Sequence, residues 1–143
     1  MGAMLVLAWP VMADVGIQDL SITNVLQPAF ATVANVGSNS VYVAKVDSLG
    51  LELQYVSNGA GVSNLTVTLQ RSLDGLVWET TPKFTWVVPL NGTNAAVAYT
   101  NLPNTVLGPA AYIRIYSISN SDSVFYATNV VCRAIRKTLK PSP

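Results

Sequence analysis

The stretch SNLTVTLQRS, residues 63–72, decides the fold class. Apolar and polar residues alternate through it without a break: Leu65, Val67 and Leu69 occupy one set of positions, and Asn64, Thr66, Thr68 and Gln70 occupy the other. Successive side chains of a β-strand point to opposite faces of its sheet. The pattern therefore predicts a strand with one buried face and one face that is wet or paired.

Similar short runs lie on both sides of this strand, separated by Gly, Asn, Ser and Pro. They cover residues 17–25, 30–36, 39–46, 49–56, 76–81, 83–90, 95–102, 110–119 and 123–137. No stretch has the spacing of an amphipathic helix. Many short strands at regular intervals predict an all-β fold, namely an antiparallel β-sandwich or a jelly-roll-like single domain over residues 17–135.

The composition points to an assembly component. The chain has 143 residues, about one domain, and only 10% of them are charged, whereas about 25% is usual for soluble domains. Surface that lacks charge is either rich in Asn, Ser and Thr, as here, or covered by a partner. We therefore expect contacts with other proteins and a homo-oligomer.

Several kinds of chemistry are excluded by residue type. The chain has no histidine and one cysteine, Cys132, which removes catalytic triads, imidazole acid–base chemistry and thiolate metal clusters. We expect Cys132 to be a small core residue. Glycosidase chemistry needs two facing carboxylates, and the spacing of Glu52, Asp74 and Glu79 brings no two of them together. We predict no enzymatic activity and no cofactor. A calcium site at Asp47 and Asp122 stays open, because calcium needs oxygen ligands but no fixed motif.

The N-terminal stretch MGAMLVLAWPVMADVG, residues 1–16, has two interpretations. We favour an apolar arm that packs on its own domain or on a neighbouring subunit, with Met4, Leu5, Val6 and Trp9 as contacts. The alternative is a secretory signal peptide cleaved after Ala13, although the stretch carries no Lys or Arg before its apolar run. It is too short to span a bilayer.

The C-terminal end carries most of the positive charge. Four basic and seven acidic residues precede residue 123, and four basic residues and no acidic residue follow: Arg133, Arg136, Lys137 and Lys140. Residues 136–143 are either a solvated tail or an electrostatic tether to an acidic neighbour. Four charges without interleaved aromatic residues argue against nucleic acid as the partner.

An Asp-Gly pair follows the deciding strand, within SLDGLVW, residues 72–78. Asp-Gly between alternating runs predicts a tight β-hairpin, since Gly75 accepts a positive φ. Ser72 and Asp74 are expected to cap turn amides, and alternation with Leu76 places Trp78 in the core. These residues are thus predicted to be structural.

Two resemblances follow from these motifs. The SLDGLVW spelling and the strand AAYIRIYS resemble discoidin-like jelly rolls, although this chain has Cys132 alone in place of their paired terminal cysteines. More broadly, LELQYV, TVTLQRSLDGLVW and YIRIYS resemble the β-sandwich modules of phage and other virion structural proteins, such as capsid decoration and tail-associated proteins. That resemblance implies a non-enzymatic role in the virion, with capsid or other virion proteins as partners.

A secreted carbohydrate-binding jelly roll is the alternative function. It would use the aromatic residues as a platform on which sugars stack: Tyr42, Tyr55, Trp86, Tyr99, Tyr112 and Tyr116. Aromatic residues on alternating strands are more often half-buried core or interface residues.

Overall fold

The computed structural model describes residues 12–23, 32–34, 39–59, 64–90, 95–108 and 110–140, and nearly all of its regular structure is β-strand. The strands are β1 Met12–Thr23, β2 Thr32–Ala34, β3 Ser40–Tyr42, β4 Ser48–Ser57, β5 Asn64–Ser72, β6 Phe84–Pro89, β7 Ala95–Asn101, β8 Tyr112–Asn120 and β9 Ala127–Lys140. A single helical turn, α1, covers Asn104–Leu107. The predicted all-β class is confirmed.

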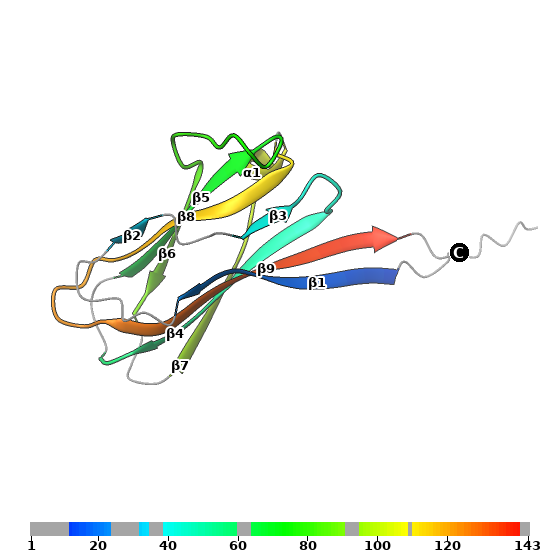
Figure 1. Cartoon of the computed structure of the whole chain (residues 1–143). Helices are drawn as coiled ribbons and strands as arrows, with labels where there is room; N and C mark the ends of the chain where they lie inside the picture. Colours follow the sequence, from blue (N-terminus) through cyan, green and yellow to red (C-terminus); the bar gives the residue numbers. More distant parts are fainter. Residues whose placement is uncertain are drawn as a thin grey trace, which may run out of the picture.

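The described strands form two antiparallel sheets that pack face to face (Figure 1). Sheet A has the order β1-β9-β4-β7. Sheet B has the order β2-β8-β5-β6. Strand β3 also pairs with β8, near its start at residues 112–114, whereas β2 pairs with residues 117–119. Together they make the predicted β-sandwich.

The pairing between strands is nested. The first strand pairs with the last, β2 and β3 pair with β8, β4 pairs with β7, and β5 pairs with β6. If β2 and β3 count as one interrupted strand, the chain is a long eight-stranded hairpin that has been folded over into two sheets. That connectivity is a jelly roll.

The core lies between the sheets and follows the alternation in the sequence. In β4, Leu49, Leu51, Leu53 and Tyr55 are buried, and in β5, Leu65, Val67 and Leu69 are fully buried. Cys132 lies among them with no exposed surface, as predicted. Burial raises the pKa of its thiol to about 12.

The outer pair of sheet A continues past the rest of the sandwich. Strand pairing between β1 and β9 extends to Met12 opposite Lys140, and Figure 1 shows the two strands projecting as a ribbon. Residues 12–16 of the expected arm and 136–140 of the expected tail therefore lie in strands. Met4, Leu5, Val6 and Trp9 lie outside the described residues.

Candidate functional site

The connection between β5 and β6 differs from the predicted hairpin. Strand β5 ends at Ser72 and β6 begins at Phe84, so residues 73–83 form a loop and residues 76–81 are not a strand. The prediction of a tight Asp-Gly hairpin was wrong. The chain turns at Gly75, but side-chain hydrogen bonds then hold residues 76–78 away from β5, which the Asp-Gly signal does not encode.

Ser72 and Asp74 organise the start of this loop. The Ser72 hydroxyl accepts hydrogen bonds from the amides of Asp74 and Gly75, at 3.3 and 2.9 Å, and donates to Asp74 Oδ1 at 3.0 Å. That oxygen also accepts the amides of Leu76 and Val77, both at 2.8 Å. Gly75 has a φ of +77°, which only glycine adopts without strain. The Val77 and Leu76 amides, followed by the Ser72 hydroxyl, lower the pKa of Asp74.

Trp78 closes the loop over the outer face of sheet B. It is half-buried and outside the core, contrary to the prediction. Its ring lies against the guanidinium of Arg114, with 4.3 Å between the guanidinium carbon and the ring centroid. Two nitrogens of Arg114 donate to Gln70 Oε1, and Gln70 Nε2 donates to the carbonyl of Glu79 at 2.6 Å. Gln70 on β5 and Arg114 on β8 thereby connect the loop to sheet B.

An ion pair fixes the other end of the loop. Arg71 and Glu79 make two parallel contacts, Nε to Oε2 at 2.9 Å and Nη2 to Oε1 at 2.6 Å. The Arg71 hydrogen bond lowers the pKa of Glu79. Arg71 also donates to the carbonyl of Val106 in α1, at 3.0 Å. Bidentate pairs of this kind restrict geometry as well as attract.

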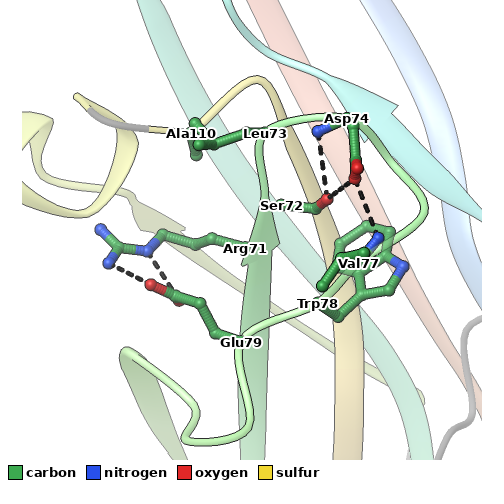
Figure 2. A pocket seen from close by; sticks show the side chains of 8 residues that line it. All are labelled: Arg71, Ser72, Leu73, Asp74, Val77, Trp78, Glu79 and Ala110. Carbon is green, nitrogen blue, oxygen red and sulfur yellow. Dashed lines mark hydrogen bonds and ion pairs between the residues drawn. The ribbon is translucent and has the colours of Figure 1, made fainter.

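The fixed loop presents three aliphatic side chains to solvent. Leu73 is 76% exposed, Leu76 is 83% exposed and Val77 is 74% exposed. Beside them lies an open pocket of about 400 Å³, which Figure 2 shows between the Arg71–Glu79 pair, Leu73 with Ala110, and Val77 with Trp78. We call residues 73–79 with this pocket the apolar loop site. Its backbone is held by the hydrogen bonds of Ser72 and Asp74 and by the Arg71–Glu79 ion pair.

The sequence interpretation missed this site because it assigned Leu76 and Val77 to a strand. The signal was nonetheless present. Leu73 precedes the Asp-Gly turn and Leu76 and Val77 follow it, where polar residues are the rule for an exposed turn. Apolar residues at a turn with no strand to bury them are candidates for a contact surface.

The carboxylates that were weighed for catalysis are all engaged. Glu79 pairs with Arg71, and Glu52 pairs with Arg133 at 3.0 Å on sheet A. Asp74 holds loop amides. In this arrangement they serve as structural acceptors.

The predicted basic contacts lie along β9. Arg133 forms ion pairs with Asp19 and Glu52. The guanidinium of Arg136 lies on the opposite face, over Gly16 and beside Lys45. Lys137 is exposed, and Lys140 pairs with Met12 at the end of the ribbon. Arg133 and Arg136 therefore lie on opposite faces of β9.

The two aspartates weighed for calcium are far apart. Asp47 donates its amide to the carbonyl of Lys137, near one end of β9. Asp122 precedes the other end and accepts the amides of Val124 and Phe125. Within the ranges that the structure describes, no three His, Cys, Asp or Glu side chains gather in a way that could hold a metal ion.

The aromatic residues of the carbohydrate hypothesis do not share one face. Tyr55 is buried and donates to the carbonyl of Pro89, and Trp86 packs against the core. Tyr42 and Tyr112 make an edge-to-face pair at 5.2 Å between β3 and β8, whereas Tyr99 lies on sheet A. A stacking platform of all six is thus contradicted.

Comparisons with known proteins show likeness in shape only. No protein-family model and no characterised sequence matches the chain. The structure is similar to a protein of the infectious bursal disease virus particle, with 14% identity and a TM-score of 0.48 over 86% of this chain. That match spans 31% of the viral protein's length. Scores below 0.5 leave the jelly-roll assignment resting on the strand pairing itself.

Two further solved structures are similar over nearly all of this chain. The PRD1 vertex protein has 10% identity and a TM-score of 0.41, and the match covers 92% of this chain and 99% of that protein. A Bacillus endospore appendage protein from a family of disulfide-linked pili has 14% identity and a TM-score of 0.33, with 98% of each chain covered.

Among the described residues, no helix has the length and apolarity needed to cross a membrane.

Proposed function

We propose that the chain is a non-enzymatic structural protein of a virion or a similar assembly, where it decorates or cements a protein shell. The observation that carries this proposal is the apolar loop site. Three exposed aliphatic side chains stand on a loop whose conformation is already fixed by Asp74, the Arg71–Glu79 pair and the Trp78–Arg114 contact. A preordered loop loses little conformational entropy on binding, so burial of its apolar surface contributes more fully to affinity.

The rest of the molecule supports contact with proteins. Jelly rolls are common among viral capsid domains and lectins, but the fold alone does not decide the function. The charged residues of the apolar loop site are engaged within it, since Glu79 pairs with Arg71 and Asp74 accepts loop amides. The projecting ribbon carries Arg136, Lys137 and Lys140 beyond the sandwich, where an acidic neighbour could bind them. The partner is thus a capsid or other virion protein, and the site of action is the virion.

A secreted carbohydrate-binding module is the alternative, and it has less support. Its stacking residues are divided between the core and two sheets, and the exposed residues of the apolar loop site are aliphatic, whereas sugars stack on aromatic faces. Nucleic acid is a poor candidate as well, because Arg133 is already paired with two carboxylates.

Particle purification from the natural source tests the proposal. We expect quantitative mass spectrometry to find the full chain at a fixed ratio to the major shell protein after repeated gradient centrifugation. The variant Leu73→Ser/Leu76→Ser/Val77→Ser should fold normally and be lost from the particles. Val124→Ser, which changes an equally exposed aliphatic residue (68%) on another loop, is the matched control and should stay bound. Retention of the triple variant at the wild-type ratio would refute the role of this site.

A further inference from the structure

A ladder of paired polar side chains crosses the outer face of sheet A. Asp19, Arg133, Glu52 and Tyr99 occupy matching positions on β1, β9, β4 and β7. Arg133 Nε lies 2.8 Å from Asp19 Oδ1, and its Nη1 lies 3.0 Å from Glu52 Oε1. A hydrogen bond to Glu52 raises the pKa of Tyr99, as expected when a phenol donates to a carboxylate. The charges of this face are thus largely satisfied within it.

Apolar side chains accompany the ladder. Ile17 is 67% exposed, Tyr99 is 66%, Val15 is 57% and Val97 is 50%. The next row of outward-facing positions, on the side of the projecting ribbon, consists of Ile17, Ile135, Gly50 and Asn101. Because Gly50 has no side chain, a hollow of about 210 Å³ opens there, lined by residues that include Ile135, Tyr99 and Lys137. The outer face of sheet A therefore carries both exposed apolar side chains and a hollow.

We propose that the outer face of sheet A binds a second copy of this chain, about a two-fold axis that runs parallel to the strands between β9 and β4. Such an axis keeps each position along the strands and exchanges β9 with β4 and β1 with β7. Arg133 of each copy then faces Glu52 of the other. Ile135 of each copy faces the hollow over Gly50 of the other.

Charge complementarity selects a second copy as the occupant. Under this axis the remaining central positions bring Lys137 opposite Ser48 and Val131 opposite Gln54, so no like charges meet. A two-fold axis that crosses the strands at Ile135 would instead place Lys137 opposite Arg133 of the other copy. Self-complementary faces give closed dimers, since every contact is made twice. A buried ion pair is tolerated in an interface when each charge keeps its partner. The charges of this ladder are already paired in the monomer and stay paired in the dimer.

The dimer goes beyond the proposed function. Attachment to a shell through the apolar loop site, which lies beside sheet B, requires no second copy, and the dimer face requires no shell. The two proposals therefore fail independently.

Sedimentation velocity of the full chain over a range of concentrations tests the dimer. We expect a monomer–dimer equilibrium for the wild type. Gly50→Val is designed to fill the hollow, and the Cβ that it adds meets its nearest neighbours at 3.4–3.8 Å, ordinary contact distances. This variant and Ile17→Ser/Tyr99→Ser should remain monomeric at concentrations at least tenfold above the wild-type midpoint. Val87→Ser removes a valine of similar exposure (52%) from sheet B and should dimerise like the wild type.

Chemical cross-linking tests the geometry. A chain with Ser48→Cys mixed with a chain with Lys137→Cys should be joined into a heterodimer by a bismaleimide that spans about 10 Å, the separation of facing sheets, whereas Ser48→Cys mixed with Val87→Cys should not. The buried Cys132 does not compete. A wild-type chain that stays monomeric throughout, or a dimer that Gly50→Val leaves intact, would overturn the inference. If the chain binds the shell as a monomer, the dimer inference fails and the proposed function stands.

Discussion

The Arg114 guanidinium packs on the ring of Trp78 at 4.3 Å, and this contact holds a loop of sheet B onto the strand beneath it. Gln70 bonds to both the arginine and the loop carbonyl of Glu79, so strand and loop share one hydrogen-bonded network. This network therefore supports the apolar loop site from sheet B.

Arg114→Ala should release the loop while the sandwich stays folded. The lost cation–π contact is worth about 1 kcal/mol, and the buried Gln70 Oε1 also loses both of its donors, which costs about 1–3 kcal/mol more. We expect faster proteolysis within residues 73–79 and a decrease of about 2–4 kcal/mol in the free energy of unfolding. Arg114→Lys keeps the charge but loses the planar fork, so its effect should be intermediate. Unchanged loop proteolysis in Arg114→Ala would show that the contact has no supporting role.

Gly75 tests the backbone of the turn. A residue with a Cβ at φ +77° costs about 1–2 kcal/mol, and Asn tolerates this region better than other residues. Gly75→Val should therefore lower the melting temperature more than Gly75→Asn. The Tyr112 ring lies 3.5 Å from the position of a Cβ, an ordinary contact, so backbone strain and not collision is the cause. Equal melting temperatures for the two variants would contradict this explanation.

Cys132 should be chemically silent in the folded protein. Its thiol has no exposed surface, and its pKa of about 12 leaves almost no thiolate at neutral pH. Ellman's reagent should react only after denaturant is added. Cys132→Ser should cost about 1–3 kcal/mol, because a hydroxyl among apolar side chains lacks a partner. Rapid labelling of the native protein would show that this part of the core opens readily.

Acid should loosen the apolar loop site. The pKa of Asp74 is lowered from its usual 3.8 by the amides that it accepts, so its contribution to the folded state is complete above that value. The contribution is lost as the pH falls through the lowered folded-state pKa. The amide NMR signals of Leu76 and Val77 should titrate with a midpoint below 3.8. Asp74→Asn should abolish this titration, and a midpoint above 3.8 would contradict the assignment.

Strands were easier to predict from the sequence than the candidate site. Alternation predicted the buried residues Leu65, Val67 and Leu69, because side-chain period and burial are set locally within each strand. The loop after Ser72 is decided by contacts from distant residues. Trp78 finds Arg114 on β8, and Arg71 finds Val106 in α1. Alternation alone could not reveal those partners, so it extended the strand pattern into the loop.

The pairing of β1 with β9 has a mechanical consequence. Met12 lies opposite Lys140, so force that separates these two residues acts perpendicular to the strands, along the direction of their hydrogen bonds. The ribbon would open like a zipper, one pair at a time from its tip, under low force. If an attachment instead pulled Met12 along the strand direction while the outer face of sheet A was held, many strand pairs would be loaded in shear at once. The ribbon would then resist a much larger force than in the zipper geometry.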